Sequence, residues 1–224
     1  MSRLGGLYVI TPEVLRASSP LAEQVAQAIA GGARLVQYRS KTGTSTERLR
    51  TARSLLAVCR TAGVPLIIND DPDLAARIGA AGVHLGRDDP DPQEARRRLG
   101  PQAIIGISCY DRLQRALEAQ AIGADYVAFG RFFPSATKPL AVPATLDLLR
   151  RARRQLGIPL VAVGGITPEN AHRPIAAGAD LVAVVEAVFG HSDIRAAAAT
   201  FAELFPEPFE APSHHRAYDH DSIP

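Results

Sequence analysis

The segment Leu160–Val185, LVAVGGITPENAHRPIAAGADLVAVV, contains one complete repeat of the fold. Its first apolar run, Leu160–Gly164, predicts a strand that is buried on both faces. Pro168 then marks a helix start, because proline is favoured at the first helical position. Gly178 follows the predicted helix end, where glycine adopts positive φ without steric cost. The second apolar run, Leu181–Val185, completes a strand–helix–strand unit of a parallel sheet.

The same order recurs along the whole chain. Short apolar, β-branched runs follow one another at intervals of roughly 20 to 30 residues, the spacing of βα units. The runs are Leu7–Thr11, Leu35–Arg39, Leu66–Asp70, Val83–Gly86, Ile104–Ser108, Tyr126–Gly130, Leu160–Gly164 and Leu181–Val185. Stretches with helical period lie between them, the clearest at about Thr46–Thr61. No GxGxxG opens the first helix, so the eight units predict a single-domain (β/α)₈ TIM barrel over residues 1–205 rather than an open doubly wound sheet.

Composition and charge exclude several classes of protein. The net charge of the 224 residues is +2, which gives no electrostatic case for a nucleic-acid partner. The arginine run at 150–154 has helical spacing and is interpreted as a solvated helix face. No apolar stretch approaches the roughly 20 residues of a membrane span. Cys59 and Cys109 are far apart in sequence, which favours a reducing, cytoplasmic location over a disulfide scaffold or a zinc site.

The chain after about Pro206 lacks the repeat. Its proline-rich start predicts a linker, and residues 206–224 are expected to be a disordered C-terminal tail. Three tail histidines, His214, His215 and His220, are expected to be solvated.

Polar residues gather where the predicted strands end. In this fold the active site is built at the C-terminal ends of the strands and the loops that follow. Those positions hold Gln37, Arg39, Lys41, Asn69, Asp70, Asp89, Ser108, Ser135, Thr137, Lys138, Gly164, Gly165, Val185 and Glu186. Lys41 and Lys138 are the only lysines among 25 basic residues, which indicates positions that need a compact ammonium group.

Two carboxylates from neighbouring strand ends, Asp70 and Asp89, are predicted to face a shared space. One or two carboxylates suit Mg²⁺, which takes its remaining ligands from water and substrate phosphates. Arg39, Lys41 and Lys138 would surround the same mouth, so these groups together could hold a diphosphate through a metal. Asp71, which precedes Pro72, is expected to cap a helix.

The Gly164-Gly165 pair precedes the helix that starts near Pro168. Backbone N–H groups at a helix N-terminus bind phosphate, and this loop is a usual phosphate site in barrels. A tight strand-to-helix connection explains the same two glycines, so both interpretations stay open here.

Six motifs occur in an order and spacing that resemble those of the thiamine-phosphate synthase family. They are Val36-Gln37-Tyr38-Arg39-Ser40-Lys41, Ile68-Asn69-Asp70, Gly82-Val83-His84-Leu85-Gly86, Ile105-Gly106-Ile107-Ser108, Phe129-Gly130-Arg131-Phe132-Phe133-Pro134-Ser135-Ala136-Thr137-Lys138 and Ala162-Val163-Gly164-Gly165-Ile166. The resemblance runs from about Leu7 to Phe205. It implies a transferase that joins 4-amino-2-methyl-5-(diphosphooxymethyl)pyrimidine to thiazole phosphate, releasing pyrophosphate by a dissociative, Mg²⁺-assisted substitution.

The resemblance also implies a role for each matching position. The pyrimidine pyrophosphate would be held by Gln37, Tyr38, Arg39, Ser40, Lys41, Asn69, Ser108 and Lys138. Arg39, Lys41, Ser108 and Lys138 would be catalytic, and Asp70 and Asp89 would hold one Mg²⁺ per subunit, with Mn²⁺ a candidate substitute. The thiazole phosphate would contact Ser135, Ala136, Thr137, Gly165, Val185 and Glu186. Both substrates are small molecules, and assembly into a homo-oligomer stays open.

Three positions depart from the family pattern. Ser40 replaces a usual acidic residue, Arg87 replaces a usual glutamine, and Glu186 replaces a serine that helps to bind the thiazole phosphate. A carboxylate facing a phosphate is repulsive. We therefore expect Glu186 to turn away or to pair with a cation such as Arg131.

Three other functions are compatible with parts of this pattern. A thiazole tautomerase of the same fold would not need Asp70, Asp89 and the Thr137-Lys138 motif. An aldolase acting through a Schiff base would need a desolvated Lys41 or Lys138. A non-catalytic barrel binding protein would share the fold alone.

Overall fold

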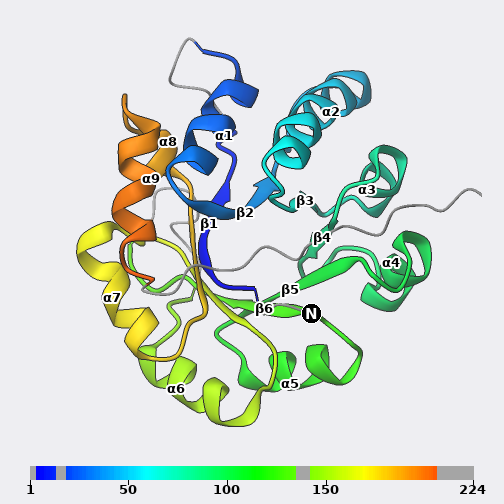
Figure 1. Cartoon of the computed structure of the whole chain (residues 1–224). Helices are drawn as coiled ribbons and strands as arrows, with labels where there is room; N and C mark the ends of the chain where they lie inside the picture. Colours follow the sequence, from blue (N-terminus) through cyan, green and yellow to red (C-terminus); the bar gives the residue numbers. More distant parts are fainter. Residues whose placement is uncertain (1–3, 14–18, 135–141, 206–224) are drawn as a thin grey trace, which may run out of the picture.

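The computed structural model describes residues 4–13, 19–134 and 142–205. Within them, eight parallel strands close into a barrel in the order β1-β2-β3-β4-β5-β6-β7-β8. The helices form an outer ring around these strands (Figure 1). The predicted (β/α)₈ barrel is confirmed. The predicted tail at 206–224 lies outside the described residues.

Each predicted apolar run overlaps one strand of the barrel. The strands are β1 (Gly6–Ile10), β2 (Ala33–Tyr38), β3 (Leu66–Asn69), β4 (Gly82–Leu85), β5 (Ile104–Tyr110), β6 (Tyr126–Phe129), β7 (Leu160–Val163) and β8 (Leu181–Val184). The helices are α1 (Leu21–Ala30), α2 (Ser45–Thr61), α3 (Pro72–Ile78), α4 (Pro92–Leu99), α5 (Leu113–Ala121), α6 (Leu146–Gln155), α7 (Pro168–Ala176), α8 (Glu186–Phe189) and α9 (Ile194–Ala202).

Capping side chains fix where several helices begin. The Asp71 carboxylate accepts a hydrogen bond from the backbone N–H of Leu74 at 2.8 Å, so the expected cap of α3 is confirmed. Asp91 caps α4 in the same way, and proline occupies the first helical position after both aspartates. The N-terminus of α3 thus follows the carboxyl end of β3 after two residues, and that of α4 follows β4 after a six-residue loop.

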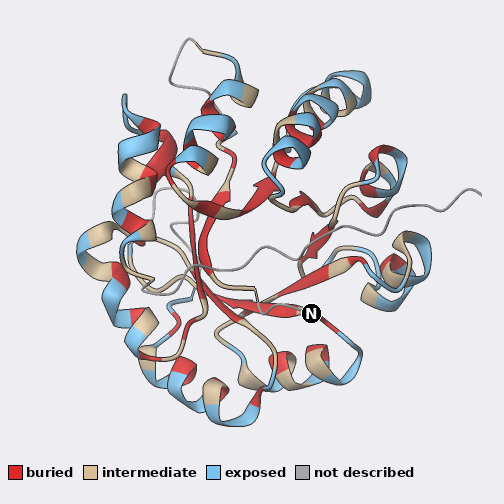
Figure 2. Ribbon diagram, in the orientation of Figure 1, coloured by how far each residue is buried: buried red, intermediate tan, exposed pale blue. Residues whose placement is uncertain are grey.

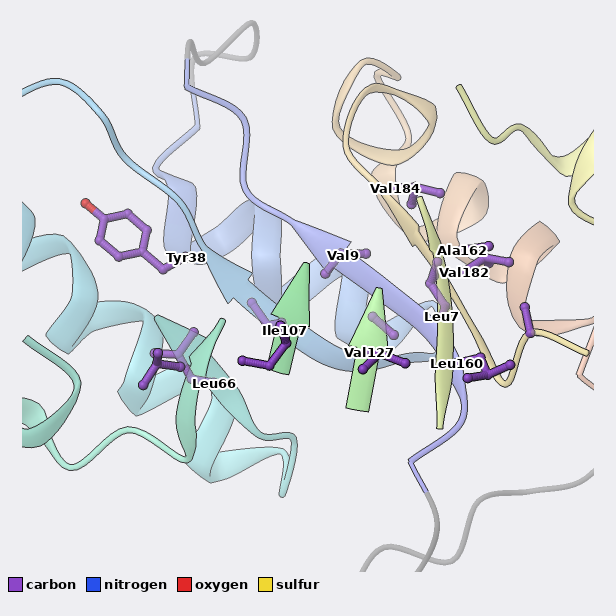
Figure 3. Close-up of a cluster of buried hydrophobic side chains, with 14 of the residues drawn as sticks. Leu7, Val9, Tyr38, Leu66, Ile107, Val127, Leu160, Ala162, Val182 and Val184 are labelled. Carbon is purple, nitrogen blue, oxygen red and sulfur yellow. The ribbon is translucent and has the colours of Figure 1, made fainter. Parts of the chain in front are cut away.

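Two apolar layers stabilise the barrel. Inside it, one layer contains Leu35, Ile67, Val161 and Leu181, which are fully buried. Between the strands and the helix ring lies the larger layer, part of which is drawn in Figure 3. Burial is therefore concentrated in the strands and on the inner faces of the helices, whereas the outer helix faces are exposed (Figure 2). This arrangement leaves the strand ends and their loops free to carry polar groups.

No helix in the described part of the chain combines the length and apolar character needed to cross a membrane.

Candidate active site

A cavity of about 510 Å³ opens at the carboxyl ends of the strands. Side chains from the predicted set line it on several strands: Gln37, Arg39, Asn69, Ser108, Gly165, Val185 and Glu186. The cavity thus lies where a barrel of this kind carries its active site.

The end of β2 sends alternate side chains to opposite faces of the sheet. Gln37 and Arg39 point to the cavity, whereas Tyr38 is buried in the layer between barrel and helices, among the core side chains of Figure 3. Neighbouring residues of a strand face opposite ways, so the Tyr38 side chain is directed away from the cavity, and the predicted role of Tyr38 in substrate binding stays a prediction. The Ser40 hydroxyl is also turned away and donates to the carbonyl of Thr42 at 2.9 Å.

Glu13 holds the loop that carries the predicted cations. Its Oε1 accepts hydrogen bonds from the backbone N–H groups of Lys41 at 2.7 Å and Thr42 at 2.9 Å, and from the Thr42 hydroxyl at 2.9 Å. Its Oε2 lies 3.4 Å from Nη1 of Arg39. Partial burial raises the pKa of the Glu13 carboxyl, but these hydrogen bonds and the Arg39 charge outweigh it and lower the pKa below its usual range. Glu13 is therefore ionised at neutral pH and holds the Arg39 side chain together with the backbone of Lys41 and Thr42.

Asp70 and Asp89, which follow the neighbouring strands β3 and β4, come into contact, as expected. Asp70 has a left-handed backbone with φ of 62°, which aspartate tolerates better than most residues, and its carboxyl shares a hydrogen bond with that of Asp89. Oδ2 of Asp89 also accepts a hydrogen bond from the backbone N–H of Gly86 at 2.6 Å. Burial, the hydrogen bond to Asp89 and the Asp89 charge raise the pKa of Asp70 to about 6, against the opposing effects of Lys41 and Asn69.

This carboxylate pair fits a divalent cation. Two acidic side chains held in contact repel one another when both are ionised, and a cation between them removes that repulsion. Among residues 4–13, 19–134 and 142–205, no group of three or more histidine, cysteine or acidic side chains is arranged to hold a metal ion. Two carboxylates are the usual protein share for Mg²⁺, whose other ligands come from water and phosphate.

The opposite side of the cavity is formed by the glycines after β7. Gly164 and Gly165 have φ values of 100° and 66°. A Cβ on Gly164 would lie 2.5 Å from Cβ of Arg131, and one on Gly165 would lie 2.3 Å from the carbonyl oxygen of Pro134. The glycines therefore permit a tight connection that packs against the loop after β6. They also line the cavity beside the N-terminus of α7, so both interpretations of this motif fit the geometry.

Glu186 lines this same end and begins the short helix α8. Its Oε2 would lie 3.2 Å from a Cβ built on Gly190, so the carboxylate extends along its own helix toward that glycine. The predicted residues Ser135, Ala136, Thr137 and Lys138 lie outside the described residues.

Sequence reasoning missed several supporting side chains. Arg115 of α5 donates to the carbonyl oxygens of Ser108 at 2.8 Å and Gly86 at 3.0 Å, which ties the ends of β5 and β4 together. Glu13 and the buried Tyr8 and Tyr126 were also missed. A tyrosine in an otherwise aliphatic strand is a signal of a buried polar partner, whereas nothing in the sequence links Glu13 to a loop 28 residues away.

A closed barrel whose open end holds paired carboxylates, fixed cations and a glycine turn defines a (β/α)₈-barrel enzyme. Residues 7–188 match the family described as thiamine monophosphate synthase. The chain therefore belongs to this family, and it is a transferase of the thiamine-phosphate synthase type.

Individual relatives agree with that assignment. The thiamine-phosphate synthase of Methylococcus capsulatus is 56% identical over 203 residues, which cover 91% of this chain and 90% of that protein. The corresponding synthase of Nitrosococcus oceani is 54% identical over 205 residues, covering 92% and 94%. Among solved structures, thiamine phosphate pyrophosphorylase from Pyrococcus furiosus is 34% identical with a TM-score of 0.80, covering 89% of this chain and 94% of that one.

Proposed function

We propose that this chain joins 4-amino-2-methyl-5-(diphosphooxymethyl)pyrimidine to thiazole phosphate and releases pyrophosphate, by a dissociative substitution that requires Mg²⁺. The observation that carries the proposal is the contact between the Asp70 and Asp89 carboxyls beside the loop of Arg39 and Lys41. That combination provides a place for a metal and two cations around one diphosphate. A cytoplasmic location is proposed with it, supported by the free thiols of Cys59 and Cys109.

The chemical difficulty is the charge that develops on the departing diphosphate. In a dissociative reaction, the bond from the pyrimidine methylene carbon to the diphosphate oxygen breaks first, and the thiazole nitrogen then attacks the resulting cation. Groups that are fixed before the reaction stabilise such charge without reorganisation. Arg39 and Lys41, held by Glu13, are proposed to bind the leaving diphosphate, and Lys138 is proposed to join them.

The metal would be held by Asp70 and Asp89. When bound, Mg²⁺ would neutralise diphosphate charge and so make pyrophosphate a better leaving group. Asn69 is proposed to assist by its hydrogen bond to Asp70, while Gln37 and Ser108 on the cavity floor are proposed to bind the pyrimidine ring.

The thiazole phosphate is proposed to bind at the other end of the cavity. Gly165 and Val185 line that end, and the described backbone N–H groups near α7 offer hydrogen-bond donors for a phosphate. Ser135, Ala136 and Thr137 are proposed to complete this end. The Glu186 carboxylate, which extends along α8 toward Gly190, is proposed not to face the phosphate directly.

The test is a single assay with the purified chain. Both substrates are supplied with Mg²⁺, with Mn²⁺, and with a chelator followed by Mg²⁺, and thiamine phosphate and pyrophosphate are both quantified. We expect equal amounts of the two products with either metal, and none in the chelator until Mg²⁺ is restored. Thiazole isomerisation without pyrophosphate release would instead indicate the tautomerase, and no product with Mg²⁺ would overturn the proposal.

A further inference from the structure

Five polar side chains from five different strands form one hydrogen-bonded chain across the barrel interior. Nε2 of Gln37 donates to the Tyr8 hydroxyl at 2.5 Å, and the hydroxyls of Tyr8 and Tyr126 lie 2.8 Å apart. The Tyr126 hydroxyl lies 3.0 Å from Nδ1 of His84, and Nε2 of His84 lies 2.8 Å from Oγ of Ser108. We call these five residues the floor relay, because Tyr8, Gln37, His84 and Ser108 line the bottom of the cavity and Tyr126 joins them.

Four of the five residues of the floor relay are almost completely buried, and Ser108 is partly exposed. Tyr126 is 0% exposed, Tyr8 1%, Gln37 2% and His84 8%. The tyrosine rings pack edge to face, with ring centres 5.9 Å apart, and the His84 ring stacks on Tyr126 at 5.6 Å. An unpaired polar group at such a depth costs about 1 to 3 kcal/mol. Side chains cannot therefore turn individually to other partners.

The hydrogens of the relay run in one direction. Since the Tyr8 oxygen accepts from Gln37, its own hydrogen is donated to Tyr126. The Tyr126 hydrogen then goes to Nδ1 of His84, which places the imidazole hydrogen on Nε2, where it is donated to Ser108. Two polar groups are left for a ligand in the cavity: the Oε1 acceptor of Gln37 and the hydroxyl donor of Ser108.

If the hydrogen bonds of the floor relay ran in the opposite direction, every residue in it would have to exchange its donor and acceptor roles. A ligand that needs a donor from Gln37 would turn the amide, so that Tyr8 donates to Gln37 and Tyr126 donates to Tyr8. The hydrogen of His84 would move to Nδ1, and the Ser108 hydrogen would be used on His84. A change at one end is therefore coupled to the other end, although Gln37 and Ser108 are not partners of one another.

We propose that Tyr8, Tyr126 and His84 are positioning residues that determine specificity: they hold Gln37 as an acceptor and Ser108 as a donor. The relay then selects a heteroaromatic ring that offers an exocyclic N–H, and it rejects the ring in which a carbonyl oxygen replaces the amine. This inference rests on the proposed function, because it takes the aminopyrimidine as the ligand of the cavity floor. It goes further by assigning amino-over-oxo discrimination to three residues that need not touch the ligand.

The experiment compares two non-reacting competitive ligands, the 4-amino and 4-oxo forms of 2-methyl-5-hydroxymethylpyrimidine monophosphate. The inhibition constant of each is measured for wild type, Tyr8→Phe and Tyr126→Phe. We expect the wild type to prefer the amino ligand by roughly 100-fold, since a site built around a hydrogen bond strongly rejects an analogue with the wrong group. Either hydroxyl deletion should reduce that preference roughly tenfold or more, because the Gln37 amide becomes free to turn.

Leu181→Val is the matched control. Leu181 is fully buried in the same interior layer but has no polar atom, so this variant should lower stability and leave the amino preference unchanged. An equal loss of affinity for both ligands in Tyr8→Phe and Tyr126→Phe, with the preference intact, would overturn the inference. If the wild type makes thiamine phosphate but shows no amino preference, the inference fails while the proposed function stands.

A second measurement is made on the wild type itself. In ¹⁵N-histidine-labelled wild type, NMR identifies which ring nitrogen of His84 carries hydrogen, and His84→Gln serves only to assign the signal. We expect hydrogen on Nε2 with Nδ1 unprotonated. Hydrogen on Nδ1 alone would show that the relay runs in the other direction and would overturn the inference.

Discussion

Asp125 and Asp180 make the same pair of contacts at two places around the barrel. Oδ2 of Asp125 accepts from the backbone N–H of Ile105 at 2.7 Å and from Arg96 at 2.6 Å. Oδ2 of Asp180 accepts from the N–H of Leu160 at 2.8 Å and from Arg153 at 2.8 Å. Each aspartate directly precedes a strand and follows a Gly-Ala pair, at the end of the barrel opposite to the cavity. Each carboxylate therefore joins a preceding strand to a helix of the outer ring.

Removal of either carboxylate should lower stability without affecting the reaction. We expect Asp125→Ala and Asp180→Ala each to reduce the free energy of unfolding by about 2 kcal/mol, because a partly buried, charge-assisted hydrogen bond and a strand N–H lose their acceptor. Urea unfolding measures the change, and kcat and KM are measured well below the transition. Asp147→Ala, at an exposed position, should shift the unfolding free energy by less than about 0.5 kcal/mol. A large loss of kcat in folded Asp125→Ala would contradict the expectation that this end of the barrel contributes to stability and not to the reaction.

Neighbouring aspartates on the loop after β3 should give opposite phenotypes. Asp70→Asn keeps a side chain that tolerates positive φ but removes the metal ligand, so we expect activity to fall at least roughly 100-fold with stability unchanged or higher. Asp71→Ala removes a helix cap and should cost about 1 kcal/mol of stability with activity retained. Product assays at saturating Mg²⁺ and thermal unfolding separate the two effects. Full activity in Asp70→Asn would refute the assignment of this carboxylate to the metal, and Asp89→Asn should match Asp70→Asn.

Glu13→Gln should release the loop of Arg39 and Lys41. The neutral amide cannot form an ion pair with Arg39 and provides one acceptor oxygen in place of two, so we expect kcat/KM for the pyrimidine substrate to fall roughly tenfold. Trypsin cleavage after Lys41 should become faster, which reports loop opening independently of activity. Glu23→Gln, on the exposed side of α1, is the control and should change neither quantity. Unchanged cleavage and turnover in Glu13→Gln would show that the loop does not depend on this carboxylate.

Alkaline pH should destabilise the fold through its two buried thiols. Burial raises the pKa of both Cys59 and Cys109 to about 12, whereas a thiol in the unfolded chain titrates near about 8.5. The contribution of the protonated thiols to the stability of the folded state is therefore complete below about pH 8.5. It is lost as pH rises toward 12, because in this range the unfolded chain releases the thiol protons and the folded chain keeps them. Between pH 8 and 10 we expect the unfolding free energy to fall by about 2 kcal/mol per thiol. Urea unfolding at both pH values, repeated with Cys59→Ala and Cys109→Ala, should show a smaller fall in each variant.

Gly106 faces Tyr126 across the pairing of β5 and β6 and should not accept a side chain. A Cβ on Gly106 would lie 2.0 Å from Cζ of Tyr126, whose ring is fully buried and held by the floor relay. We expect Gly106→Ala to cost about 3 kcal/mol or more in unfolding free energy. Gly5→Ala, whose Cβ would lie 3.6 Å from the Asp180 carbonyl oxygen, should be nearly neutral. Equal stability of the two variants would mean that Tyr126 can move to accommodate a methyl group at position 106.

The sequence was sufficient for the barrel because strand burial and glycine turns are local signals that repeat. It was also sufficient for the meeting of Asp70 and Asp89, since parallel strands place their carboxyl ends on one side. The direction of the Tyr38 side chain did not follow from the resemblance, because the resemblance names whole motifs, whereas a strand alternates its faces at every residue. The floor relay, and the contacts by which Glu13 holds the loop of Arg39 and Lys41, depend on residues that are far apart in sequence. Such contacts leave no local pattern, so only the folded structure reveals them.

The close approach of Gly106 and Tyr126 also limits how related sequences can diverge. A lineage that gained a side chain at the first position would need a smaller ring or none at the second, and losing the tyrosine would break the chain that leads from Gln37 to Ser108. A substitution at only one of these two positions is therefore disfavoured, whereas both positions can change together. These two residues should be inherited as a pair wherever amino-specific recognition is retained, and exchanged as a pair where a descendant barrel takes up another ring.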